Sequence, residues 1–175
     1  MSEYSRRIIA LNIRCISLGF IAIEEPRELL DWGVRRFSSR RAGTKVPLQR
    51  KIEQMLDNYD PQIVVVNIPL VQPQALAVSV VKEISRRRSV AFKMLSPSDI
   101  SAAFGNRHQN KFELAAALAG QITELRPYLP SKRKPWESEP YQMRIFDAAA
   151  LALAYLHSEL PSQPGEFCRR PLISE

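Results

Sequence analysis

The stretch SRRIIALNIRCISLGFIAIEE (residues 5–25) reads as two β-strands joined by a tight turn, and one residue in it stands out. Asn12 lies near the end of the first strand, among the apolar neighbours Ile9, Leu11 and Ile13. A neutral amide in such a run is most often bonded to a nearby backbone group. The meaning of Asn12 therefore depends on what the rest of the chain brings to this position.

The segments that follow predict a sheet with mixed strand directions. RELLDWGVRRF (residues 27–37) alternates as a third strand with Leu30, Trp32 and Val34 on one face, so the first three strands form an antiparallel meander. A basic loop over residues 38–45 comes next, and helical spacing of apolar residues begins at Pro47. IVVVNIP (residues 63–69) is an unbroken β-branched run, as expected of a strand buried on both faces.

The second half of the chain adds helices and one more strand. Apolar spacing predicts helices over residues 73–88, 96–105, 110–125 and 141–160, a strand over 89–95 and a proline-rich loop over 126–140. Leu76 and Val81 are among the predicted buried positions of the helix over 73–88. The elements predict one domain over residues 1–160 and a flexible tail over 161–175. The order of these elements resembles that of the ribonuclease H-like fold, so the expected fold class is α/β, with a ribonuclease H-like mixed five-stranded sheet flanked by helices.

The composition suggests a location and a redox state. Of the 175 residues 45% are hydrophobic, and no stretch approaches the roughly 20 unbroken apolar residues that span a bilayer. No secretory leader is recognisable, so a cytoplasmic location without membrane attachment is expected. Cys15 and Cys168 lie far apart without metal-binding spacing, which predicts two reduced thiols.

The net charge of +7 and the isoelectric point near 9.7 favour a polyanionic partner, and nucleic acid is the commonest one. Basic residues gather in runs at 35–45, 86–88 and 132–134. Trp136 follows the last run, which predicts either a ring for base stacking or an anchor for the loop. The predicted nucleic-acid-binding residues are Arg35, Arg36, Arg40, Arg41, Lys45, Lys132, Arg133, Lys134 and Trp136.

Four segments together resemble the RuvC family of Holliday junction resolvases, in the ribonuclease H-like superfamily, over about residues 8–157. They are IIALNIRCISLGFIAIE in the first hairpin, DPQIVVVNIP at the fourth strand, AFKMLSPSDISAAFGNRHQNKFELAAALA at the fifth strand and its helices, and FDAAALALAYL in the last helix. The order and spacing of the segments carry the resemblance, since none is specific alone. It implies binding of branched DNA, dependence on Mg²⁺ or Mn²⁺, and a homodimer.

The resemblance places the family's catalytic acids on four positions of this chain. Asn12 falls on the aspartate of the first strand and Asn67 on the glutamate of the fourth. Asp147 and Ala150 fall on the two acids of the last helix, so Asp147 alone keeps a carboxylate and is the one predicted metal ligand. Lys111 matches a lysine that the family has before its penultimate helix.

The loss of three negative charges leaves the charge of two Mg²⁺ ions largely unbalanced, so weak metal binding and little cleavage are expected. The leading hypothesis is a protein that binds branched or structured DNA without cutting it. One alternative is an active Mg²⁺-dependent endonuclease that uses Asp147 with Asp99 or Glu113, and a second is a protein-interaction module on the same fold. His108 is a general-base candidate for the enzyme, and His157 is expected as a charge at the end of the last helix.

Overall fold

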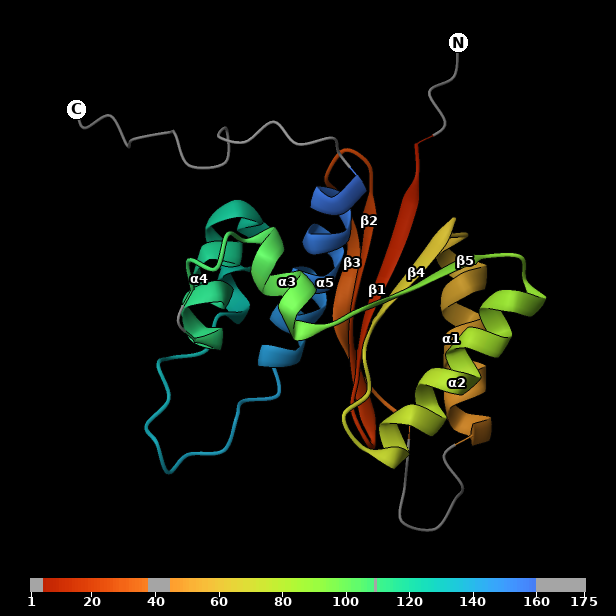
Figure 1. The fold of residues 1–175 in the computed structure, drawn as a ribbon, viewed down its shortest axis with the longest axis horizontal. Coiled ribbons are helices and arrows are strands. Elements are labelled where there is room, and N and C mark those ends of the chain that lie inside the picture. The colour runs from red at the N-terminus through yellow and green to blue at the C-terminus, as the bar shows by residue number, and fades with distance from the viewer. Residues whose placement is uncertain (1–4, 38–44, 109, 160–175) are drawn as a thin grey trace.

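A five-stranded sheet forms the centre of the computed structural model of the chain, which describes residues 5–37, 45–108 and 110–159 (Figure 1). The strands are β1 (Arg7–Ile13), β2 (Ser17–Glu24), β3 (Glu28–Arg36), β4 (Ile63–Asn67) and β5 (Ala91–Leu95). They lie in the order β3-β2-β1-β4-β5, with β1 and β3 antiparallel to β2, and β1, β4 and β5 mutually parallel. The predicted meander and mixed sheet are confirmed.

Some predictions fall outside the described residues. These are the loop over 38–44, the tail from residue 161, and the residues Arg40, Arg41 and Cys168. In the described ranges, no helix combines the length and the apolar character needed to cross a membrane.

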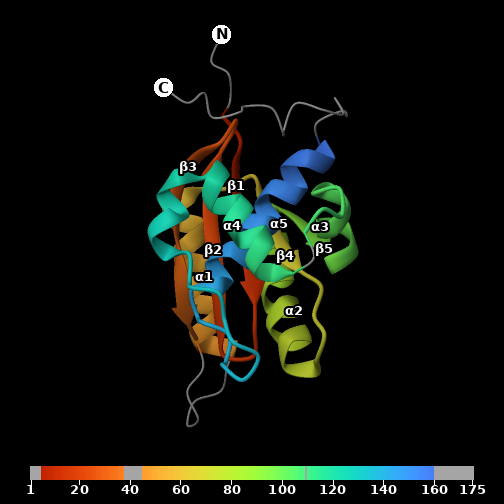
Figure 2. The same ribbon diagram turned by 90° about the vertical axis from the view of Figure 1, so that its left-hand side faces the viewer.

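Helices cover both faces of the sheet and give a three-layered arrangement (Figures 1 and 2). One face carries α1 (Lys45–Tyr59) and α2 (Gln72–Arg87), and the other carries α3 (Pro97–Ala103), α4 (Lys111–Gln121) and α5 (Met143–Glu159). β1 is buried on both sides, because Ile8 and Ala10 pack toward α5 while Ile9 and Leu11 pack toward α1 and α2. The alternation of β1 therefore decides which side chains can face α5.

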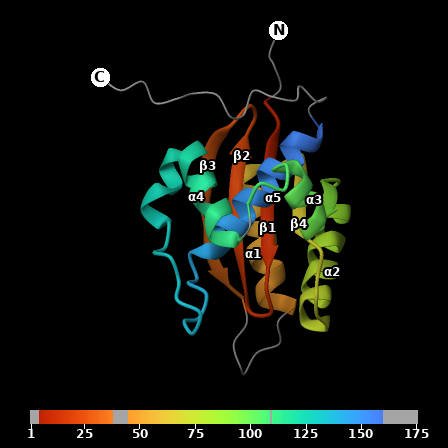
Figure 3. The ribbon, with the colours of Figure 1, turned by 60° about the vertical axis from the view of Figure 1, so that its left-hand side comes forward.

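One edge of the sheet collects the ends of four strands. β1 and β3 both run antiparallel to β2, and β4 and β5 run parallel to β1, so these four strands end at the same edge of the sheet. In Figure 3, β1 and β3 point downward toward this edge. α5 begins near this edge, since Asp147 in its second turn contacts Arg14 just beyond β1, whereas Tyr155 contacts Arg6 just before β1. We call it the carboxyl edge; its strands end at Ile13, Arg36, Asn67 and Leu95.

The prediction that Leu30 shares a face of β3 with Trp32 and Val34 is wrong for Leu30. The pairing of β2 with β3 shifts register between Ala22 and Ile23, and this irregularity adds a residue to β3. Leu29 therefore joins Trp32 on the side of α5, while Leu30 packs on the side of α1 and α2. A strict alternation of period two does not anticipate such a bulge.

Two helices also differ from their predictions. Leu76 of α2 is 67% exposed, because the buried stripe of that helix runs through Ala77, Val78 and Val81. The helix predicted over 110–125 ends at Gln121, where Ile122 takes an extended conformation, and a 3₁₀ helix follows over Thr123–Tyr128. Part of the predicted proline-rich loop is therefore regular structure.

Candidate functional site

Two asparagine side chains lie beside each other at the carboxyl edge, on the face that α5 covers. Asn12 lies on the same face of β1 as Ala10, and Asn67 lies on the same face of β4 as Val65. The parallel register of the two strands brings both positions to the same level of the sheet. Asn12 is only 8% exposed, so its amide needs partners within the protein.

The amide of Asn67 extends the pairing of β1 with β4 beyond the end of the ladder. Its Oδ1 accepts a hydrogen bond from the backbone N–H of Ile13 at 2.7 Å, and its Nδ2 donates to the backbone oxygen of Ile13 at 3.3 Å. A carboxylate could accept the first bond but could not donate the second. The backbone-bonding role that is usual for a strand asparagine therefore belongs to Asn67.

A close approach of α5 to the sheet brings Asp147 to these amides. Gly19 of β2 pairs with Asn12, and a Cβ atom on Gly19 would lie 2.1 Å from the backbone oxygen of Arg144. Glycine at this position lets the first turn of α5 rest directly on the sheet. Asp147 and Ala150, one helical turn apart, consequently face the same space as the two amides.

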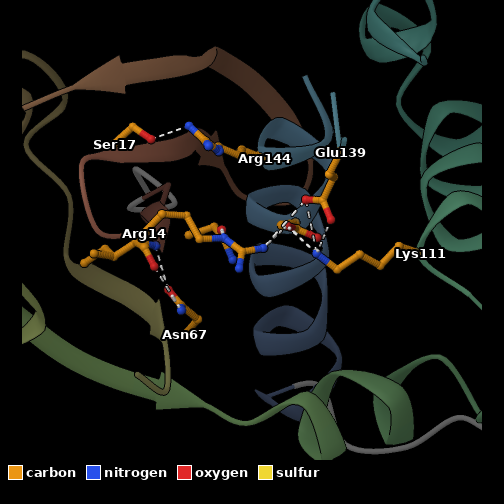
Figure 4. A network of polar contacts seen from close by, with 9 residues as sticks. Arg14, Ser17, Asn67, Lys111, Glu139 and Arg144 are labelled. Atoms are coloured by element: carbon orange, nitrogen blue, oxygen red, sulfur yellow. Dashed lines mark hydrogen bonds and ion pairs between the residues drawn. The ribbon is translucent and has the colours of Figure 1, made fainter. Parts of the chain in front are cut away.

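Two cations converge on the carboxylates of this centre (Figure 4). Arg14 donates from Nε to Asn12 Oδ1 at 3.2 Å and from Nη2 to Asp147 Oδ2 at 3.2 Å. Lys111 Nζ lies 3.1 Å from Asp147 Oδ2 and 3.3 Å from Glu139 Oε2. Glu139 Oε1 is also 3.7 Å from Arg14 Nη2. We call Arg14, Lys111, Glu139 and Asp147 the ion-pair network; its two cations and two carboxylates balance in charge.

This set of donors does not fit the two-metal centre that the resemblance implies. The carboxylate of Asp147 is mostly buried and binds both Arg14 and Lys111. Across the described ranges, no group of three or more histidine, cysteine, aspartate or glutamate side chains could hold a metal ion. Two Mg²⁺ ions require several anionic oxygen ligands, whereas this centre already satisfies its one matched carboxylate with side-chain cations.

The two further acids considered for an active endonuclease bond elsewhere. Asp99 forms a capping box with Ser96 at the start of α3, and the hydrogen bonds from Ser96 lower the pKa of Asp99. Glu113 lies at the start of α4, where its carboxylate accepts from Asn110 Nδ2 at 3.2 Å. Neither acid lines the space beside Asn12, so the structure does not place them as metal ligands with Asp147.

A cavity of about 370 Å³ opens beside the ion-pair network. The cavity is lined by all five residues that the sequence placed at one centre: Asn12, Asn67, Lys111, Asp147 and Ala150. Apolar side chains from the end of β5, from α3 and from α4 also line the cavity, among them Leu95, Ile100 and Leu114. The structure thus brings the matched positions together around one ligand-sized space.

The predicted basic runs differ in their position on the fold and in their partners. Residues 86–88 end α2, which starts after β4 and runs back to the other edge of the sheet, and each of the three arginines pairs there with a carboxylate of α1 or α2. The other runs lie near the carboxyl edge, at the end of β3, at the start of α1 and in the loop that leads to α5. Their described members are all exposed: Arg35, Arg36, Lys45, Lys132, Arg133 and Lys134.

The loop before α5 presents a tryptophan to solvent. Trp136 is 78% exposed, and Lys134 Nζ lies 5.7 Å from the centre of its ring. The interpretation of Trp136 as an anchor for the loop is therefore wrong. Contacts within the loop hold its shape instead, since Glu137 accepts a hydrogen bond from the backbone N–H of Lys134 at 3.0 Å.

The two histidines occupy different surroundings. His108 lines the cavity, with its ring 6.3 Å from that of Phe104. His157 Nδ1 lies 3.1 Å from the backbone oxygen of Ala103, and its ring packs at 5.6 Å from Phe104. His157 lies in the last turn of α5 and packs this helix against the end of α3.

Three residues of the centre were not singled out in the sequence. Arg14 lies two positions after Asn12, so alternation alone could have placed it on the same face. Glu139 and Gly19 have no comparable local signal, because one belongs to an irregular loop and the other depends on how closely α5 approaches.

Several solved Holliday junction resolvases share this fold. RuvC of T. thermophilus in complex with a Holliday junction substrate is 16% identical, with a TM-score of 0.63 over 87% of this chain and 93% of that one. The fowlpox virus resolvase is 14% identical, with a TM-score of 0.58 over 88% and 99%. The yeast mitochondrial resolvase is 10% identical, with a TM-score of 0.60 over 87% and 80%. No protein-family model and no curated protein matches the chain.

Proposed function

We propose that this chain, which has the RuvC-like, ribonuclease H-like fold, binds branched DNA and cleaves it little or not at all. The proposal takes its DNA substrate from two neighbours in fold: both the T. thermophilus RuvC and the fowlpox virus resolvase have been solved with Holliday junction DNA. The exposed basic residues near the carboxyl edge supply the positive field that a DNA backbone requires.

One observation carries the proposed loss of cleavage. The guanidinium of Arg14 lies 3.2 Å from both Asn12 and Asp147, between two positions that the resemblance assigns to metal-binding acids. A fixed cation there repels a divalent ion and occupies the oxygen atoms that the ion would need. The centre can still receive a phosphate, because Arg14 and Lys111 are both donors that bind phosphate oxygens.

Two further parts of the proposal come from the resemblance and the composition. We propose that the protein acts as a homodimer and in the cytoplasm. Mg²⁺ and Mn²⁺ are expected to bind weakly or not at all at the ion-pair network.

A paired assay on labelled four-way junction and matched duplex DNA tests the proposal at low salt. Binding is measured with EDTA, and cleavage is measured with Mg²⁺ or Mn²⁺. The expected result is preferential junction binding without cleavage. Cutting by the unmodified protein that disappears in Asp147→Ala would show an active nuclease, while binding to neither DNA would favour a protein-interaction module.

A gain-of-function variant tests why cleavage is absent. Asn12→Asp, Asn67→Glu and Ala150→Asp restore the matched acids, but the new carboxylate at position 12 would pair with Arg14. We therefore expect metal-dependent cutting only when Arg14→Ala is added. Cutting by the triple variant with Arg14 intact would contradict the role given to this guanidinium.

A further inference from the structure

Two hydrogen-bond donors at the cavity find no acceptor in the described part of the chain. They are the amide nitrogens of Asn12 and Gln74, which both line the cavity and are only 8% and 6% exposed. Asn12 Oδ1 accepts a hydrogen bond from Arg14 Nε at 3.2 Å, and Gln74 Oε1 accepts one from the backbone N–H of Leu70 at 2.8 Å. Because a donor must face an oxygen, these bonds fix the orientation of each amide and leave its NH2 group available.

Both NH2 groups have access to the cavity. Neither Asn12 Nδ2 nor Gln74 Nε2 is sealed from solvent, and both residues line this space. A donor on a side chain that is more than nine-tenths buried favours a fixed acceptor, since burial leaves it few other partners. The cavity therefore presents two directed donors to whatever enters it.

The charged side chains of the ion-pair network are already satisfied. Arg14 and Lys111 each lie within ion-pair distance of both Asp147 and Glu139. An anionic ligand would have to compete with these carboxylates, and a cationic ligand would meet the two basic groups. A ligand without charge leaves the network intact, so it enters at the smallest electrostatic cost.

Apolar side chains favour a ligand with a largely apolar body. Leu95, Ile100, Phe104 and Leu114 all line the cavity. Its volume of about 370 Å³ lies within the usual range of sites for small organic ligands, about 300–1,000 Å³. Sites of this kind combine an apolar lining with a few directed polar groups, which here are the two amides.

We infer that this cavity binds an uncharged, largely apolar organic ligand whose carbonyl oxygen accepts hydrogen bonds from Asn12 Nδ2 and Gln74 Nε2. The inference is independent of the proposed function, because none of these contacts involves nucleic acid. It also gives the amide at position 12 a chemical role. A carboxylate there would offer only acceptors, whereas the amide offers a donor beside the oxygen that Arg14 uses.

Three small probes, each added to the full chain, separate the chemical requirements of the cavity. N,N-dimethylbenzamide has a ring and an accepting carbonyl but neither a donor nor a charge. Benzoate replaces the amide by an anion, and toluene has no acceptor. Saturation-transfer NMR detects binding, and titration gives each Kd. We expect N,N-dimethylbenzamide to bind at least about fivefold more tightly than either of the others, as one net hydrogen bond would give.

Substitutions of the two amides locate the carbonyl. Asn12→Asp and Gln74→Glu keep the accepting oxygen and remove the NH2 group, so each should weaken the binding of N,N-dimethylbenzamide by about fivefold or more. Gln74→Met is measured beside them, because a protonated glutamic acid could still donate. Gln54→Glu is the matched control, since Gln54 is exposed in α1 and does not line the cavity. Circular dichroism and thermal unfolding establish that each variant is folded.

Four outcomes would overturn the inference. Benzoate that binds as tightly as N,N-dimethylbenzamide would reveal an anion site, and toluene that binds as tightly would show that the amides take no part. Unchanged affinity in the amide variants would place the carbonyl elsewhere, and absence of binding to the parent chain would reject this class of ligand. Junction binding by the same preparation is scored separately, because it tests the proposed function alone.

Discussion

At the scale of single residues, Arg14 decides what the centre can bind. Its guanidinium spans the distance between Asn12 on β1 and Asp147 on α5, so one side chain joins the sheet to the helix that covers it. A planar guanidinium suits this bridge because its donors point in several fixed directions. The same geometry that holds the two elements together also places positive charge where an anionic ligand would enter.

The two asparagines should respond differently to the same substitution. Asn67→Asp removes the donor to the backbone oxygen of Ile13, and we expect a loss of roughly 1–2 kcal/mol in the free energy of unfolding. Asn12→Asp should cost less, because Arg14 donates to this position and can pair with the new carboxylate. Urea unfolding at pH 7 measures both, and equal losses would contradict the distinct roles of the two amides.

Tyr59 predicts a dependence of stability on alkaline pH. Partial burial, a hydrogen bond to Asp31 and the charge of Asp31 raise the pKa of the Tyr59 hydroxyl from 10.0 to about 12. A raised pKa means that the folded state favours the neutral phenol, so this contribution is complete below pH 10 and disappears as the pH rises toward 12.

The measurement is urea unfolding of the parent chain and of Tyr59→Phe across pH 8.5 to about 11.5, within the range that the shifted pKa defines. The parent should lose stability more steeply than the variant over the upper part of this range. Parallel curves would show that the ionisation of Tyr59 is not coupled to folding.

At the scale of elements, the contact of α5 with β2 sets the distance between the start of this helix and the sheet. A methyl group on Gly19 would overlap the backbone of Arg144, and neither backbone can move without displacing the start of α5. We expect Gly19→Ala to lower the free energy of unfolding by about 2–3 kcal/mol and to weaken the contact of Arg14 with Asp147.

Gly120→Ala is a matched control for this substitution. Gly120 is exposed in α4, and an added Cβ there would meet no atom within 4 Å. Alanine is the better helix former by about 1 kcal/mol, so this variant should be as stable as the parent or more so. Thermal unfolding compares the two variants. A similar loss of stability in both would show that the close approach of α5 at Gly19 does not restrict the side chain at that position.

At the scale of the whole molecule, the basic runs differ in their partners. The run at 132–134 is exposed in the loop that leads to α5, whereas each of the arginines at 86–88, also exposed, pairs with a carboxylate of α1 or α2. DNA should therefore approach the carboxyl edge. The exposed ring of Trp136 lies on that side, next to the cations of its loop.

Substituting one run at a time tests this orientation. Lys132→Ala, Arg133→Ala and Lys134→Ala together should weaken junction binding and reduce the slope of log K against log salt by about 0.9 for each DNA phosphate that the protein no longer neutralises. Arg86→Ala, Arg87→Ala and Arg88→Ala together change the same number of charges at the far end and should leave both quantities nearly unchanged. Fluorescence anisotropy over a range of salt concentrations measures this, and equal effects would mean that net charge alone governs binding.

The sequence by itself determined the order of the elements and the positions of the two amides. The sequence pattern of β1 and β4 indicates which of their residues are buried. The small residues of α5 indicate a helix that lies close to the sheet. These sequence patterns depend on neighbouring residues alone, so they can be recognised without knowledge of the fold. Their order along the chain was enough to reach the ribonuclease H-like arrangement.

Only the tertiary structure decided how the charged side chains of the centre pair with one another. Arg14, Lys111, Glu139 and Asp147 come from four separate segments, and their ion pairs depend on how closely α5 approaches the sheet. The bulge that turns Leu30 to the other face and the exposure of Trp136 are likewise absent from any local pattern. Periodicity records which side of an element is buried, whereas contacts between distant side chains follow from the packing of elements against one another.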